Sequence, residues 1–299
     1  MFIVVTWLVV KGLPHMVQKF SFYALLFLLF NPFSAYSKET IAWQTYHRPP
    51  GTFNYGEYKG QGFVQKILQM VTEKMPEYNH EMPITTLARA IADINAGLNV
   101  CHPALYITAE RKKSMYFSNA TILNATNRII AKPESVAPFL ENNQVNLEKL
   151  LKNNSVTVGH VQGRSYGNAI DAIFTKHSQL ANILPLQNID LTRVFKLLER
   201  DRVDITIAYP FEIQHYLKNH ADEDSQLAVF AIAKMPPYDT GAVACPKNKW
   251  GKKVINKVNS VLAELKPTVE YKQALTAWRE ADQHSELFQQ YYEKYFLKH

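Results

Sequence analysis

Residues 155–208 read SVTVGHVQGRSYGNAIDAIFTKHSQLANILPLQNIDLTRVFKLLERDRVDITIA and alternate short apolar segments with longer amphipathic ones. The short segments predict strands at Ser155–Gly159, Ile183–Leu186 and Val203–Ala208. The longer segments predict helices at Ser165–His177 and Leu191–Glu199, because their apolar residues recur every three or four positions. This alternation predicts an α/β fold with helices on both faces of a sheet.

The same alternation precedes this region. It predicts, in chain order, a strand at Ile41–Trp43, a helix at Gly62–Met75, a short strand at Glu81–Ile84, a helix at Leu87–Ala96 and a strand at Asn99–His102. A weakly periodic run around Lys132-Pro133 and Asn142-Asn143 separates the two sets. We interpret it as the connection between two lobes.

The pattern resumes towards the C-terminus. Ala242–Cys245 predicts a strand, and the apolar residues from Val254 to Leu262 have helical spacing. Phe288–Leu297 alternates aromatic and basic residues, which is more typical of the packing face of a closing helix than of a membrane-binding segment.

The N-terminal residues have the composition of a secretory leader. Lys19 precedes an apolar run over residues 20–30, and small residues follow it up to Ser37. The run is shorter than the ~20 residues that a membrane span needs. We therefore expect residues 1–37 to be a cleaved signal peptide that directs the protein to the periplasm, whether translation starts at Met1 or at Met16.

The charge and length of the mature protein limit its expected partners and its number of domains. Loss of the leader removes Lys11 and Lys19 and lowers the formal net charge from +7 to +5. The basic residues are scattered among acidic ones, so nucleic-acid binding is not expected. The remaining 262 residues are enough for one large domain or two smaller ones, in a protein that we expect to be a monomer.

Cys101 and Cys245 are the only cysteines of the chain. In an oxidising compartment they could form a disulfide, and two unrelated buried thiols are the alternative. Two cysteines so far apart, without clustered histidines, make a poor metal site. The sequence also has no phosphate-loop glycine motif, so we expect no metal and no cofactor.

Four stretches give the chain a resemblance to a known family. They are Trp43–Pro50, a strand with a proline turn; Arg89–Asn99, an arginine with an apolar helix and a glycine; Ile107-Thr108-Ala109-Glu110-Arg111 followed by Tyr116-Phe117-Ser118; and Leu197–Asp204, a helix, a basic turn and an aspartate. In this order they resemble the extracellular solute-binding proteins of family 3, the periplasmic substrate-binding type of polar amino acid ABC transporters. The resemblance implies the type II periplasmic binding protein fold.

The resemblance also implies a domain organisation with two α/β lobes and two hinge strands. Lobe 1 would comprise residues 38–131 and 242–299, and lobe 2 residues 132–241. The hinge strands would lie near Arg128–Lys132 and Tyr238–Val243.

The family's strand order further implies that Asn99–His102 pairs antiparallel with Ala242–Cys245. That pairing would bring Cys101 and Cys245 together, so we expect a disulfide that holds the returning chain against lobe 1.

The resemblance gives Arg111 the role of binding a ligand carboxylate, which a planar guanidinium can do with two parallel hydrogen bonds. The alternative is a surface arginine, because Glu110, Lys112 and Lys113 surround it. Ser165 belongs to Gly163-Arg164-Ser165, between a strand and a helix. The backbone N–H groups and the helix dipole are expected to favour an anion there.

Two positions depart from the family's pattern. Tyr209 stands where the family has an acidic residue that neutralises an α-amino group, and Tyr106 ends a segment that lacks most of the family's hydroxyl donors. An anion or a larger, flatter ligand is therefore favoured over a standard α-amino acid. Tyr46 and Tyr209 are expected to stack on the ligand, and Arg89 is either a second anion contact or a helix-surface residue.

These features favour a non-catalytic protein that captures a small polar, carboxylate-bearing ligand for an inner-membrane ABC permease. A sensory or partner-binding protein with the same fold is the second candidate. An enzyme such as a dehydratase of prephenate-like substrates is the third, and it would need a poised acid or base. His47, His102 and His160 have no acidic partner at recognisable spacing.

Overall fold

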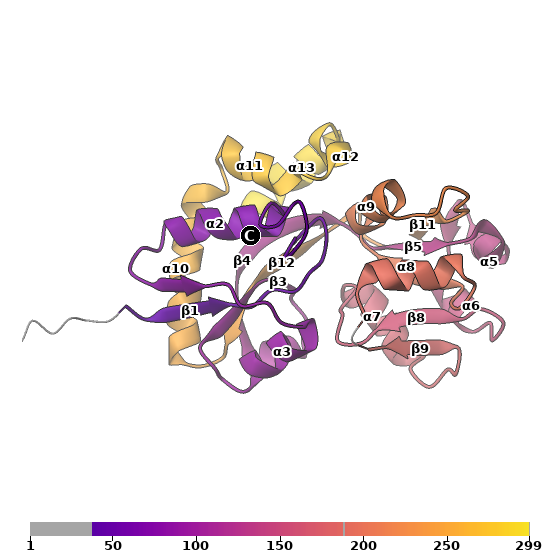
Figure 1. Cartoon of the computed structure of the whole chain (residues 1–299), viewed down its shortest axis with the longest axis horizontal. Coiled ribbons are helices and arrows are strands. Elements are labelled where there is room, and N and C mark those ends of the chain that lie inside the picture. The colour runs from indigo at the N-terminus through magenta and orange to yellow at the C-terminus, as the bar shows by residue number, and fades with distance from the viewer. Residues whose placement is uncertain (1–37, 188, 299) are drawn as a thin grey trace, which may run out of the picture. The chain divides into compact units, whose positions relative to one another are not determined.

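The computed structural model describes residues 38–187 and 189–298, which carry two β-sheets (Figure 1). The signal peptide expected over residues 1–37, with its alternative starts Met1 and Met16, lies outside the described residues. Within the described part of the chain, no helix combines the length and the apolar composition that crossing a bilayer requires.

The first sheet has five strands in the order β2-β1-β3-β12-β4. Their bounds are β1 Thr40–Trp43, β2 Asn79–Glu81, β3 Val100–Tyr106, β4 Met115–Ala125 and β12 Tyr238–Pro246. β1 pairs in parallel with β2 and β3, whereas β12 pairs antiparallel with β3 and β4. A strand from the end of the chain thus lies between two strands from its beginning.

Helices cover both faces of this sheet. They are α2 Phe63–Glu73, α3 Leu87–Asn95, α4 Arg111–Ser114, α10 Lys249–Leu265, α11 Val269–Thr276, α12 Glu280–Gln283 and α13 Glu286–Lys294, followed by the 3-10 turn η2 Phe296–Lys298. Ile41 and Trp43 of β1 pack into the core formed with α2 and α10, whereas Ala42 between them packs against α3. The alternation follows from successive strand side chains pointing to opposite faces.

The second sheet has seven strands in the order β6-β7-β11-β5-β10-β8-β9. Their bounds are β5 Arg128–Ala131, β6 Leu140–Glu141, β7 Gln144–Val145, β8 Val158–Val161, β9 Ile183–Leu186, β10 Ile205–Ala208 and β11 Ala228–Ile232. β8 pairs in parallel with β9 and β10, and β5 pairs antiparallel with β10 and β11.

The helices of the second sheet also lie on both of its faces. They are α5 Pro133–Val136, the 3-10 turn η1 Ala137–Phe139, α6 Leu147–Leu151, α7 Asn168–Lys176, α8 Leu191–Glu199 and α9 Pro210–Asn219. Ile129 of β5 packs with α6 and α7, whereas Ile130 packs with α8 and α9. The predicted α/β architecture is confirmed.

The segment after Lys132 differs from its prediction as a connection. Residues 133–151 contain α5, η1, β6, β7 and α6, and β7 pairs in parallel with β11. The interpretation was wrong because these elements are only two to five residues long, too short to show a period in the sequence. Arg128–Ala131, expected near a hinge, is an inner strand of the second sheet.

The helix predicted from Ser165 begins three residues later, at Asn168. Asp171 is the reason, since its carboxylate accepts hydrogen bonds from the backbone N–H of Tyr166 at 2.8 Å and from the hydroxyl of Ser165. Gly167 then turns the chain into the helix with a φ of 98°, a conformation that side chains other than glycine's rarely adopt.

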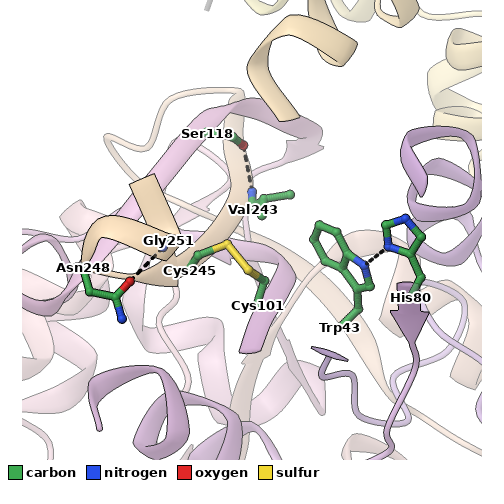
Figure 2. Close-up of a disulfide and its surroundings, with 8 residues drawn as sticks. All are labelled: Trp43, His80, Cys101, Ser118, Val243, Cys245, Asn248 and Gly251. Carbon is green, nitrogen blue, oxygen red and sulfur yellow. Dashed lines mark hydrogen bonds between the residues drawn. A yellow bond between two sulfur atoms is a disulfide. The ribbon is translucent and has the colours of Figure 1, made fainter. Parts of the chain in front are cut away.

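The predicted antiparallel pairing of the segments around Cys101 and Cys245 is confirmed, with Ala244 opposite His102 and Ala242 opposite Leu105. The predicted disulfide is present as well, with a Cα–Cα distance of 4.4 Å (Figure 2). Both cysteines are completely buried. Figure 2 also shows the neighbouring hydrogen bond from Trp43 Nε1 to His80 Nδ1, 3.0 Å long. The disulfide therefore links β3 to β12 within the core.

Candidate ligand-binding site

Three arginine side chains line one small pocket, which we call the arginine pocket. Arg48 follows β1, Arg111 begins α4, and Arg164 lies between β8 and α7. The pocket has a volume of about 30 Å³, which is the space of roughly one water molecule. Its other lining residues are Tyr46, Leu87, Ala104, Leu105, Tyr106, Ser165 and Tyr209.

Most of the residues expected to contact the ligand are brought together here. Arg111, Tyr46, Tyr106, Ser165 and Tyr209 all line the arginine pocket. Arg89 does not. Its side chain is 67% exposed on α3, and its Nε lies 2.8 Å from Asp93 Oδ1. Of the two alternatives for Arg89, the structure shows the helix-surface position.

Glu212, in the first turn of α9, is shared by two of the three guanidinium groups. Its Oε2 lies 2.6 Å from Arg164 Nη2, and its Oε1 lies 3.2 Å from Arg164 Nη1 and 3.4 Å from Arg48 Nη1. The backbone N–H of Tyr209 donates to Oε2 at 2.9 Å. The exposed fraction is 1% for Glu212 and 6% for Arg164. Two cations thus share one buried anion.

The three arginines differ in how their charge is compensated. Burial opposes the charge of Arg48 and Arg164, but the neighbouring Glu212 and Tyr46 outweigh it and hold the pKa of both guanidinium groups above its ordinary value. Burial instead lowers the pKa of Arg111. Arg111 donates to two backbone carbonyls, Tyr106 O at 3.0 Å and Gly163 O at 3.3 Å, and to no carboxylate among the described residues.

Tyr209 brings the aromatic and the cationic groups of the pocket together. Its ring stacks on that of Tyr106, with centroids 5.9 Å apart and an interplanar angle of 19°. The Cζ atoms of Arg48 and Arg164 lie 5.6 Å and 5.3 Å from its centroid, within the range of cation–π contacts. Burial raises the pKa of Tyr209 to about 12. At neutral pH its phenol is uncharged and cannot neutralise an ammonium group.

Ser165 lies at the pocket, but its hydroxyl is already used as a donor to Asp171. The expected anion site at the start of a helix is displaced, because α7 begins only at Asn168 and the carbonyl of Gly163 accepts from Arg111. The positive charge facing the pocket on this side is therefore the Arg164 side chain rather than a helix N-terminus.

Sequence reasoning did not identify Arg48, Arg164 or Glu212 as site residues. Arg48 stands in a turn that was recognised for its prolines, and Arg164 in a loop that was considered for its backbone. Glu212 follows Pro210 in the first helical turn, where an acidic residue looks like an ordinary N-terminal cap. Only the fold brings these three side chains together across 48 and 164 positions of the chain.

A larger cavity, which we call the side cavity, adjoins the arginine pocket and has a volume of about 260 Å³. The two share Tyr46, Arg48, Leu87 and Arg164. Two segments that follow strands of the first sheet, residues 46–49 and 85–88, form one wall of the side cavity. Residues between Val161 and Tyr216, which belong to the part of the chain around the second sheet, form the other wall. Two arginines stand at the shared wall, and the remaining lining mixes apolar residues, such as Leu191 and Phe195, with polar ones, such as Thr85 and Gln162.

The histidines near the site are neutral at pH 7. Burial lowers the pKa of His102 to about 3, with the positive charges of Arg48 and Arg111 adding to the effect. Burial also lowers the pKa of His47, and that of His215 to about 4. The described residues contain no group of three histidine, cysteine or acidic side chains that could hold a metal ion. The site's chemistry is thus that of guanidinium and aromatic groups.

Comparisons with known proteins identify the family and the fold of the chain. The model of the bacterial extracellular solute-binding proteins, family 3, matches residues 41–281. A comparison with curated proteins gave no match.

Solved structures similar to this chain include an ancestral arginine-binding protein bound to arginine, with 20% identity, a TM-score of 0.63, and coverage of 81% of this chain and 99% of that one. An amino acid ABC transporter substrate-binding protein from Streptococcus pneumoniae bound to L-arginine has 17% identity, a TM-score of 0.62, and coverage of 81% and 94%. The GluR0 ligand-binding core from Nostoc punctiforme in complex with L-glutamate has 15% identity, a TM-score of 0.59, and coverage of 81% and 99%. With a family model that spans most of its length, this chain belongs to the bacterial extracellular solute-binding proteins of family 3.

Proposed function

We propose that this protein captures a small carboxylate-bearing solute in the arginine pocket and delivers it to an ABC permease of the inner membrane. The observation that carries the proposal is the charge of the pocket: three arginines line it, and one buried carboxylate serves two of them. The third, Arg111, is half-buried and has no carboxylate partner among the described residues, so a ligand carboxylate would supply the missing charge.

Arg111 is the proposed primary contact with the carboxylate. Its hydrogen bonds to Tyr106 O and Gly163 O fix the guanidinium without neutralising it. Tyr46, Tyr106 and Tyr209 supply aromatic walls, and Ser165 borders the carboxylate position. We retain this set as the proposed contacts, without Arg89.

The proposal includes two lobes that close on the ligand. Lobe 1 is built on the first sheet and lobe 2 on the second, and the chain passes between them at Thr126-Asn127 and near Pro236. Contacts such as Arg48 with Glu212 and Arg111 with Gly163 would form on closure. We further propose a monomeric, non-catalytic periplasmic protein whose mature chain begins at Lys38.

A thermal-shift screen of the mature chain against amino acids, dicarboxylates, aromatic acids and oligopeptides tests the proposal, with Arg111→Ala as the control. A ligand that binds only the native state stabilises it by about 2.7 kcal/mol at a hundredfold excess over Kd. We expect a carboxylate to raise the melting temperature of the wild type and not that of the variant. If no compound does so, the proposed capture of a carboxylate is wrong and a partner-binding role takes its place.

A further inference from the structure

Two larger spaces adjoin the arginine pocket. One is the side cavity. The other, which we call the polar cavity, has a volume of about 390 Å³ and shares Arg111, Arg164 and Ser165 with the arginine pocket. The arginine pocket holds about 30 Å³, enough for the end of a carboxylate and little else. The side cavity of about 260 Å³ has room for roughly nine groups of water size, at about 30 Å³ each. Polar and charged residues form most of the polar cavity's lining, whereas the side cavity has several apolar walls. For a ligand with its carboxylate at the arginines, the side cavity, which shares Arg48 and Arg164 with the pocket, is therefore the space that suits an apolar remainder.

The side cavity is suited to a flat, apolar body. Its apolar walls are formed by Pro49, Leu87, Ala88, Val161, Leu191 and Phe195. His47 also lines the cavity, and its ring stacks on that of Tyr55, with centroids 3.7 Å apart and an interplanar angle of 12°. A wall made of stacked rings favours a planar group over a flexible chain, because ring faces stack on one another.

Each carboxylate that lines the cavities already has a cation or a hydrogen-bond donor as its partner. The acidic residues that line them are Asp190 and Glu212 in the side cavity and Glu110 and Asp171 in the polar cavity. Glu212 is bound to two arginines and a backbone N–H, and Asp171 to Ser165 and Tyr166.

The other two acids are also engaged. Asp190 accepts from the backbone N–H of Arg193 at 3.0 Å and lies 3.5 Å from its Nε. Glu110 pairs with Lys113 at 2.5 Å on the surface. An ammonium group near the carboxylate of the ligand would instead face the guanidinium groups. Nε of Arg164 is itself a buried donor that has no hydrogen-bond partner among the described residues.

We propose that the ligand is an aromatic carboxylic acid without an amino group, with its carboxylate at Arg111, Arg48 and Arg164 and its ring in the side cavity. This inference rests on the proposed function, since it names the chemical class of the same ligand. It separates this chain from the arginine-bound proteins that share its fold, because a guanidinium-bearing ligand would add a cation to a pocket that already has an excess.

Isothermal titration calorimetry of the mature chain with three matched carboxylates tests the proposal. The probes are 3-phenylpropionate, L-phenylalanine, which adds an ammonium group, and hexanoate, which replaces the ring by a chain; L-arginine is the fourth. We expect 3-phenylpropionate to bind with a Kd lower by about tenfold or more than each of the others. Tighter binding of L-phenylalanine, hexanoate or L-arginine overturns the inference and leaves the carboxylate site in place. If none of the four binds, this inference fails, and the wider screen decides the proposed function separately.

Two substitutions on the exposed side of α3 test where the ring lies. Ala88 lines the side cavity, whereas Ala92, one turn later on the same helix, is exposed and does not. We expect Ala88→Trp to fill the cavity and weaken binding of 3-phenylpropionate by about tenfold or more, and Ala92→Trp to leave it unchanged. Equal affinity of both variants and the wild type would show that the ring lies elsewhere.

Discussion

The Glu212 carboxylate and the Arg164 guanidinium form a bidentate ion pair, with contacts of 2.6 Å and 3.2 Å, in a position almost closed to water. Arg48 contacts the same carboxylate from the other sheet's side. The Glu212 carboxylate thus holds the guanidinium groups of Arg48 and Arg164 beside the arginine pocket, and these charges set the net charge of the pocket. Its loss should affect both the stability of the fold and the ligand site.

Glu212→Gln keeps the shape of the side chain but removes its charge. Because a buried pair that loses one partner leaves an uncompensated ion, we expect the free energy of unfolding to fall by about 3–5 kcal/mol. Urea denaturation measures this free energy of unfolding. Glu39→Gln is the control, since Glu39 pairs with Lys253 on the surface and its substitution should change stability by less than about 1 kcal/mol. Equal losses in the two variants would contradict this account of Glu212.

The disulfide between Cys101 and Cys245 closes a loop of 144 residues. In the chain-entropy account, a cross-link over so long a loop destabilises the unfolded state, and its removal costs about 2–5 kcal/mol. The Cys101→Ser, Cys245→Ser double variant should therefore melt at a lower temperature than the wild type. A thiol assay of the denatured wild type should find free thiols only after reduction. Equal numbers before and after would refute the bridge.

His102 predicts a pH dependence of stability. Its pKa is about 3 in the folded state, chiefly through burial, and 6.5 in the unfolded chain. Below pH 6.5 the unfolded state therefore binds a proton that the folded state does not. Stability falls as the pH decreases from 6.5 towards 3, by up to about 1.4 kcal/mol per pH unit.

His102→Asn tests this assignment. In the wild type His102 Nδ1 accepts from the backbone N–H of Ala104 at 3.1 Å, a bond that an asparagine oxygen can replace. Urea unfolding at pH 7 and pH 5 should show a smaller loss of stability for the variant than for the wild type. An unchanged loss would assign the dependence to other groups, such as His215.

Gly251 at the start of α10 has no room for a side chain. A Cβ there would lie 1.9 Å from the carbonyl oxygen of Pro246, which belongs to β12. Gly251→Ala should lower the free energy of unfolding by about 1–3 kcal/mol, because the helix start must move away from the strand. Asn256→Ala, at an exposed position of the same helix, is the control and should change stability by less than about 0.5 kcal/mol.

The sequence was sufficient to predict those helices and strands in which the apolar residues keep one spacing along the whole element. α2, α3, α8 and the strands β1, β9 and β10 lie within two residues or so of their predicted bounds. β4 was missed although it is the longest strand, because its sequence MYFSNATILNA places Ser118, Asn119 and Asn124 among the apolar residues. Ser118 is buried there to accept from the backbone N–H of Val243, a role that only the pairing with β12 explains.

The candidate site was predictable in part for a similar reason. The residues around Arg111 form a local motif, and five of the expected contacts do meet at one pocket. Arg48, Arg164 and Glu212 belong to no local motif, and their relationship depends on contacts between segments that are far apart in the chain. What distinguishes these three residues is that their charges are buried next to one another, and this can be recognised only in the folded protein.

Recognition of a carboxylate by buried guanidinium groups is the central claim, and the most direct measurement compares an acid with its own amide. The best carboxylate from the thermal-shift screen and the primary amide of the same acid are titrated into the mature chain by calorimetry. The amide keeps the shape of the ligand but lacks its charge, so we predict that its Kd is higher by about a hundredfold. Equal affinity for the acid and the amide would contradict the account.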